Sequence, residues 1–206
     1  MKELRVISAF LVTLSLIYSC VEETSIVVEQ ELPSQYNSKV MSLAKAVNAA
    51  VRENAGYRSL IKEEVSKLVD GDYDYLFSTA MDHKVTPSSE LVTRSDCSSN
   101  ITVKELLSYY YEPYNVKTRS SLDELEALIA EYPELQISVP VHAEDWDTES
   151  YVPVVAVVPE DCKYPGVKTL PAIDAEGNEI EIDAVNEPEE PVIVVGLNER
   201  LMEKPE

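Results

Sequence analysis

The spacing of apolar residues changes near Pro133, and this change restricts the possible folds more than any other feature of the sequence. In the stretch 40–51, apolar residues recur every three or four positions, whereas in the stretch 135–141 they alternate with other residues. A repeat near 3.6 is typical of an amphipathic helix, and a repeat of 2 is typical of a half-buried strand. The sequence therefore predicts an α+β fold, with N-terminal helices packed on a C-terminal, mainly antiparallel sheet of four or five strands.

The helical part, residues 35–133, is predicted to begin with helices over 40–51 and 58–69. Gly56 is the expected stop of the first helix, and Gly71 is the expected left-handed cap of the second. The apolar face of the second helix would include residues near its end, Leu68 and Val69. A short third helix over 73–80 is a further expectation, since its apolar residues also follow helical spacing.

Two capping boxes predict two more helices. Thr102–Glu105 and Ser121–Glu124 each place a hydroxyl three residues before a glutamate, so each can satisfy backbone amides at a helix start. These helices should end before Pro113 and Pro133, because the residue before a proline avoids the helical conformation.

The strand-rich part, residues 134–200, contains apolar runs and one hairpin signal. The run 152–158 is apolar throughout and predicts a strand covered on both faces. A turn at 175–178 predicts a hairpin of 169–174 with 179–183, and the last strand is expected at 192–195. We expect all of residues 35–206 to form a single domain.

The N-terminus has the features of an export signal. Lys2 and Arg5 precede the apolar run Val6–Ile17, which is shorter than the roughly 20 residues that span a bilayer. The segment Ile17–Cys20 resembles the lipobox of bacterial lipoproteins. The resemblance implies a signal peptide over 1–19, lipidation at Cys20 and an exported, membrane-anchored protein, with the outer membrane as the expected location. The alternative is an ordinary thiol beside an uncleaved hydrophobic helix.

Residues 20–34 are predicted to be an acidic tether between the lipid and the domain. Its glutamates just after Cys20 resemble the surface-export signal of some Gram-negative lipoproteins, and a plain acidic linker is the alternative. The segments 67–74, 152–159 and 191–200 resemble uncharacterised exported bacterial lipoproteins. That family has no known activity, so the resemblance assigns no catalytic or ligand-binding residue.

The charge of the chain excludes one class of partner. The chain has 17 Lys and Arg against 38 Asp and Glu, a net charge of −21. Nucleic-acid binding depends on cations that neutralise phosphates, and no basic stripe is present. The same charge predicts that the domain does not bind anionic lipid, so that the membrane partner is reached through the lipid anchor alone.

Two cysteines remain once Cys20 is assigned to the lipid. Cys97 lies in a polar stretch and Cys162 follows an apolar run, so both are expected in loops. An even pair in an exported chain can form a disulfide, and two separate thiols are the alternative.

The densest polar cluster follows the strand at 135–141. It contains His142, Glu144, Asp145 and Asp147, whose oxygens suit calcium and whose imidazole suits zinc. No H-E-x-x-H or G-x-S-x-G motif accompanies it, and the other acidic cluster, 70–74, lacks the spacing of an EF-hand. No cofactor is expected, with calcium as the exception to test.

Aromatic residues supply the other candidate surface. Tyr111, Tyr114 and Trp146 lie in or near polar segments, and exposed aromatic rings provide rigid contact area for proteins or sugars. We therefore expect a lipid-anchored envelope protein with a binding or assembly role, an envelope protein or glycan as partner, and no chemistry of its own. The alternative is a metal-assisted hydrolase or calcium-binding module that uses the loop His142–Asp147.

Overall fold

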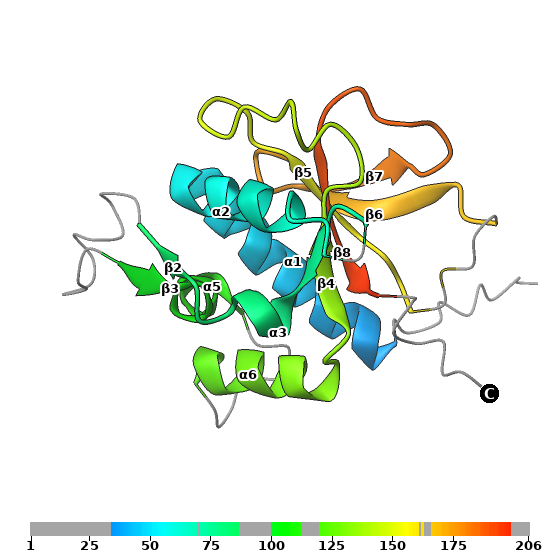
Figure 1. The fold of residues 1–206 in the computed structure, drawn as a ribbon. Coiled ribbons are helices and arrows are strands. Elements are labelled where there is room, and N and C mark those ends of the chain that lie inside the picture. Colours follow the sequence, from blue (N-terminus) through cyan, green and yellow to red (C-terminus); the bar gives the residue numbers. More distant parts are fainter. Residues whose placement is uncertain are drawn as a thin grey trace, which may run out of the picture. The chain divides into compact units, whose positions relative to one another are not determined.

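The computed structural model describes residues 34–69, 71–86, 100–112, 120–160, 162 and 166–198. The chain divides into two units, Met1–Leu32 and Pro33–Glu206, and all described residues belong to the second. In this unit, helices from the first part of the chain cover a sheet built mostly from the last part, so the predicted α+β class is confirmed (Figure 1).

The main sheet has six strands in the order β1-β4-β8-β5-β6-β7. The strands are β1 (Asp74–Leu76), β4 (Leu135–Ser138), β5 (Val154–Val157), β6 (Thr169–Ile173), β7 (Glu179–Asp183) and β8 (Val192–Leu197). Neighbouring strands are antiparallel except β5 and β8, which run parallel in the middle of the sheet. The sheet is therefore mainly antiparallel, as predicted, but it has one strand more than the five expected.

The additional strand comes from the segment 73–80, which was predicted to be a helix. Its first half forms β1, where Tyr75 pairs with Ile137 of β4, and only its second half forms the short helix α3 (Phe77–Ala80). The side chain of Tyr75 is buried between the sheet and the helices. Pairing with a long-range partner therefore overrides the local helical spacing of the segment.

The first helix, α1 (Gln35–Glu53), begins at Ser34, whose hydroxyl accepts a hydrogen bond from the amide of Asn37 at 3.1 Å. It ends at Asn54, which is extended, and α2 (Ala55–Val65) follows directly. Gly56 thus lies inside α2, and its predicted role as the stop of α1 is wrong. A glycine is needed there because a Cβ atom would come within 2.9 Å of the carbonyl oxygen of Thr86.

The end of α2 also differs from the prediction. The helix stops at Val65, Leu68 adopts a left-handed φ of 47°, and Val69 is 82% exposed instead of contributing to an apolar helix face. Gly71 is left-handed, with φ of 98°, as expected for a cap. Its amide donates to the carbonyl of Leu68, so it closes the turn that follows the helix and not the helix itself.

The remaining helices start at hydroxyl caps. Thr102 and Glu105 form the predicted capping box of α5 (Val103–Tyr110). For α6 (Ser121–Glu131) the cap is Ser120, which accepts from the amide of Asp123 at 3.2 Å, so the capping box predicted at Ser121 is wrong by one residue. Both helices end before the prolines, as expected. A separate pair of short strands, β2 (Lys84–Val85) and β3 (Ile101–Thr102), precedes α5.

The core lies between the helices and one face of the sheet. Residues of α1, such as Leu43 and Val47, pack with residues of the central strands, such as Val155 and Ile193, and all four are fully buried. The other face of β5 contributes Ala156 to a smaller apolar cluster. Burial of β5 on both faces confirms the prediction from its uninterrupted apolar run.

Candidate functional site

Two carboxylates of the acidic loop that follows β4 accept hydrogen bonds, one from Tyr73 outside the loop and the other from within the loop. The carboxylate of Glu144 accepts from the hydroxyl of Tyr73 at 2.7 Å, and Asp147 accepts from the hydroxyl of Ser150 and the amide of Glu149. These hydrogen bonds lower the pKa of Asp147, chiefly through Ser150. The carboxylates at 144 and 147 therefore stabilise the loop.

This loop does not assemble the ligands of a metal ion. His142 and Asp145 are exposed, and His142 has a left-handed φ of 56°. In the part of the chain that the structure describes, no three His, Cys, Asp or Glu side chains lie close enough together to hold one ion. The described residues therefore provide no set of metal ligands for the alternative prediction of a metal-assisted hydrolase.

Two cations from α2 attach the loop to the helical layer. Lys62 donates to the carbonyls of Glu144 and Trp146 at 2.7 and 2.8 Å. Arg58, which is buried, donates to the carbonyls of Thr148 and Glu149 and also to Val51 at the end of α1. The loop is therefore a fixed part of the fold.

The predicted aromatic surface is mostly internal. Trp146 is 2% exposed and donates its indole N–H to the carbonyl of Tyr151 at 3.2 Å, and Tyr111 is 5% exposed. Both belong to the core, so the prediction that they form a binding surface is wrong. Among the aromatic residues that the structure describes, Tyr109 is exposed, at 48%.

Of the four remaining predicted site residues, the structure describes one, Cys162. Tyr114, Cys20 and Cys97 lie outside the described residues, and Cys162 is half-buried. Lipidation at Cys20 and the pairing of Cys97 with Cys162 stay predictions.

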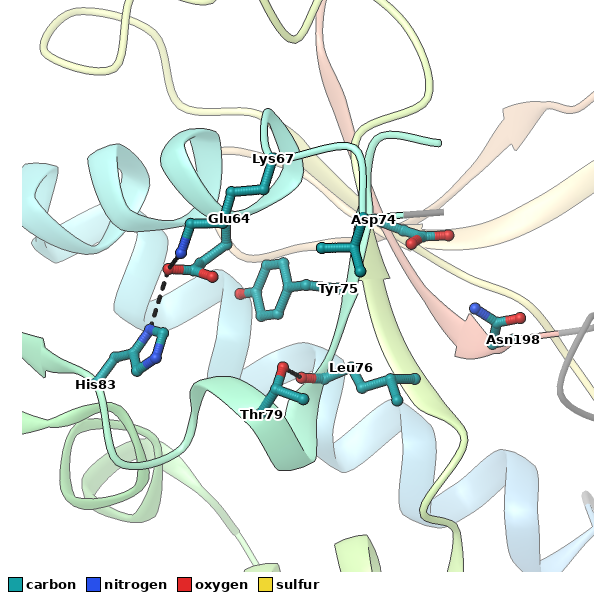
Figure 2. Close-up of a pocket in the computed structure, with 9 residues that line it drawn as sticks. Glu64, Lys67, Asp74, Tyr75, Leu76, Thr79, His83 and Asn198 are labelled. Carbon is teal, nitrogen blue, oxygen red and sulfur yellow. Dashed lines mark hydrogen bonds and ion pairs between the residues drawn. The ribbon is translucent and has the colours of Figure 1, made fainter. Parts of the chain in front are cut away.

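A pocket of about 430 Å³ lies beside β1, at the edge of the sheet. We call it the β1 pocket. Its lining comes from the end of α2, from β1, from α3 and from the turn after α3, with Asn198 following β8: Glu64, Lys67, Val69, Asp74, Tyr75, Leu76, Thr79, His83 and Asn198. Figure 2 shows the ring of Tyr75 extending toward Glu64, whereas Asp74 and Leu76 extend to the opposite side of the strand, as the alternation of a strand requires.

Among the charged residues that line the β1 pocket, Glu64 is the buried one. Its side chain is 8% exposed, and one carboxylate oxygen, Oε1, contacts both Nζ of Lys67 at 2.5 Å and Nδ1 of His83 at 3.1 Å (Figure 2). A carboxylate in the last turn of a helix opposes the helix dipole, and its burial adds a desolvation cost. The two nitrogen donors offset these costs and fix the carboxylate at the pocket wall.

The hydroxyl groups of the pocket lining remain protonated. Burial, together with the nearby Tyr57 and the charge of Glu64, raises the pKa of Tyr75 well above its ordinary value. The hydroxyl of Thr79 donates to the carbonyl of Leu76 at 2.7 Å. These groups can form hydrogen bonds with a ligand, but neither is paired with a base that would make it a nucleophile.

Sequence reasoning missed Glu64 and His83 because no motif connects them. They come from a helix end and from the turn after α3, and only the fold brings them together. The sequence pattern offers no signal for Glu64, because it lies in the middle of the predicted helix 58–69 and only the earlier end at Val65 puts it in the last turn.

None of the known protein families matches the chain, and neither a curated protein nor a solved structure shows significant similarity to it. The described helices include none with the length and apolar content needed to cross a membrane.

Proposed function

We propose that this protein is a lipid-anchored protein of the bacterial envelope that binds a small amphipathic ligand in the β1 pocket. The observation that carries the binding role is the buried Glu64 carboxylate at the wall of an open pocket, held by Lys67 and His83. A concave site with a few fixed polar groups is the usual form of a small-molecule site.

The chemistry of the lining defines the ligand class. Oε1 of Glu64 contacts Lys67 and His83, which leaves Oε2 as an acceptor for an amine or hydroxyl of the ligand. Val69 and Leu76 supply apolar wall. The ligand should therefore combine a hydrogen-bond donor with an apolar part.

Binding is favoured over covalent catalysis by the state of the hydroxyl groups. Tyr75 is kept protonated by burial, and Thr79 is bonded to a backbone carbonyl. A nucleophile needs an adjacent base or a lowered pKa, and these described hydroxyls have neither.

The proposal of a lipid anchor is supported by the sequence alone. The run Val6–Ile17 before Cys20 supports export and lipidation, and several acyl chains together hold a protein durably on a membrane. Growth with labelled palmitate tests this step directly. The wild-type chain should carry the label, and Cys20→Ser should lose it and move from the membrane fraction to the soluble fraction.

The binding role is tested by a ligand-observed NMR screen of small amines and alcohols with apolar groups, using the full chain in detergent. Hits should lose most of their signal in Glu64→Gln and keep it in Glu63→Gln, because Glu63 is an exposed neighbour on the same helix. Val69→Ser provides a second variant that alters the wall without touching a buried group. A screen without hits, or hits that survive both Glu64→Gln and Val69→Ser, would overturn the proposal.

A further inference from the structure

A second pocket, of about 560 Å³, lies between α1, the end of α5 and the turn that joins β6 to β7. We call it the tyrosine pocket. Its lining includes Lys45, Asn48, Arg52, Tyr109, Glu112 and Gly177. They differ from the lining of the β1 pocket, so the inference does not depend on the proposed function.

Arg52 brings a positive charge to this pocket in a strongly acidic protein. Its guanidinium lies against the β6–β7 turn, where a Cβ atom on Gly177 would come within 2.5 Å of Nη1. Among the described residues, no carboxylate forms an ion pair with Arg52. A planar guanidinium of this kind suits bidentate binding of a ligand carboxylate.

Lys45 adds a second cation from the same helix. It pairs with Glu179 at 2.6 Å, and both side chains are more than half exposed. An exposed pair of this kind contributes little to stability, so a ligand carboxylate can take the place of Glu179 at low cost.

Asn48 places a fixed acceptor between the two cations. The residue is 2% exposed, and its amide nitrogen donates to the carbonyl of Asp174 at 2.9 Å and, more weakly, to that of Ile173. These bonds fix the orientation of the side chain. None of the described residues donates to Oδ1, which lies 3.9 Å from the position that a Cβ atom would take on Gly177. Because Oδ1 has a lone pair that no described residue uses, it can accept a hydrogen bond from a sugar hydroxyl.

The aromatic wall is formed by Tyr109. Its ring is about half exposed and packs edge to face on Tyr110, with the ring centres 4.9 Å apart. Tyr110 is in turn held by a hydrogen bond from its hydroxyl to Glu53 at 2.6 Å. A fixed, exposed aromatic ring offers the apolar contact area on which a sugar ring can lie.

From these groups we infer that the tyrosine pocket binds a carboxylated sugar, with the carboxylate on Arg52 and Lys45, hydroxyls on Asn48 and the ring against Tyr109. Glu112 also lines the pocket. The carboxylate of Glu112 repels negative charge. The pocket therefore favours a ligand that has hydroxyl groups and a single carboxylate per ring over a compact polyanion such as phosphate.

The test titrates the full chain in detergent with a trisaccharide of galacturonic acid and follows the backbone amides by NMR. Arg52→Gln should weaken binding about tenfold or more, because it removes a charge-assisted, bidentate contact. Lys168→Gln is the matched control, since it removes an exposed cation outside the pocket and should leave the affinity unchanged. A neutral galactose trisaccharide should bind at least about tenfold more weakly than the acidic one to the wild-type chain.

A pair of glycine variants tests the same contact without changing charge. Gly177 and Gly71 have φ angles of 95° and 98°, so Ala costs each a similar backbone strain. Only Gly177→Ala places a methyl group against Arg52, because a Cβ at Gly71 meets nothing within 4 Å. Gly177→Ala should therefore weaken binding of the acidic trisaccharide, and Gly71→Ala should not.

Each remaining outcome would overturn the inference. It fails if the acidic trisaccharide does not bind at millimolar concentration, or if Arg52→Gln and Lys168→Gln weaken it equally. It also fails if inorganic phosphate or a triglutamate peptide binds as tightly, since the pocket would then select anions and not sugars.

Discussion

At the scale of single residues, Arg58 shows how a buried cation can serve structure alone. It is 5% exposed and donates to backbone carbonyls at the end of α1 and in the loop that follows β4. Its charge is therefore distributed over carbonyl dipoles, with Asp147 and Glu149 as the nearby carboxylates. The sequence shows only an arginine in a predicted helix, and no pattern indicates that its side chain turns inward.

We predict that Arg58→Met destabilises the protein by about 3 kcal/mol, because several buried carbonyls lose a charged donor. Urea unfolding of the full chain in detergent measures the change. Lys168→Met should change the free energy of unfolding by less than about 0.5 kcal/mol, since Lys168 is exposed. Equal denaturation midpoints for the two variants would show that the Arg58 contacts do not stabilise the fold.

The lowered pKa of Asp174 makes the free energy of unfolding depend on pH. Its carboxylate accepts from the side chain and amide of Asn178 and from the amide of Glu176, and these bonds lower its pKa below the ordinary value of 3.8. A carboxyl whose pKa is lower in the folded state stabilises that state above the unfolded pKa. The contribution is then lost as the pH falls through the folded pKa.

The advantage of the wild-type chain over Asp174→Asn should therefore be present at about pH 6 and shrink by about pH 2.5. Free energies of unfolding at both values test this. Asp145→Asn removes a carboxylate that accepts no hydrogen bond from a described residue, and its effect should change less between the two values. If the difference in free energy of unfolding between the wild-type chain and Asp174→Asn did not change with pH, the pKa of Asp174 would not be lowered in the folded state.

At the scale of elements, hydrophobic spacing located most helices and strands but not their ends. The hairpin of β6 and β7 and the doubly buried β5 follow from local patterns. The break at Asn54 was missed because the apolar spacing continues into α2. The strand β1 was missed because its buried residues fit a helical repeat as well as an alternating one, and only pairing with β4 decides between them.

The start of α6 allows a test of which serine caps the helix, Ser120 as in the structure or Ser121 as the sequence pattern predicted. Ser120 caps the helix, and Ser121 is its first residue. Ser120→Ala should lower the free energy of unfolding by about 1 kcal/mol, whereas Ser121→Ala should have almost no effect. Thermal unfolding of both variants tests this, and the reverse order would restore the capping box expected at Ser121.

At the scale of the whole molecule, the class of the fold was predictable and the order of its strands was not. The alternating and the continuously apolar segments together identify five strands, but β8 returns past the β6–β7 hairpin to lie parallel to β5. The candidate site shows the same limit. Glu64 and His83 meet because the end of α2 and the turn after α3 pack beside β1, and this depends on contacts between segments with no common motif.

From the net charge of −21 we predict that the protein surface itself does not bind an anionic membrane. Anionic lipid attracts basic segments at about 1 kcal/mol per cation near the surface, and an acidic protein is repelled instead. The chain with Cys20→Ser, freed of its first 19 residues, should therefore not sediment with vesicles of phosphatidylcholine containing about 30% phosphatidylglycerol at about 0.1 M salt. The wild-type chain, with the lipid that we propose on Cys20, should sediment with the same vesicles and remain bound when salt is raised. If the Cys20→Ser chain sediments and salt releases it, the protein holds an electrostatic membrane surface of its own, and the lipid is not the sole attachment.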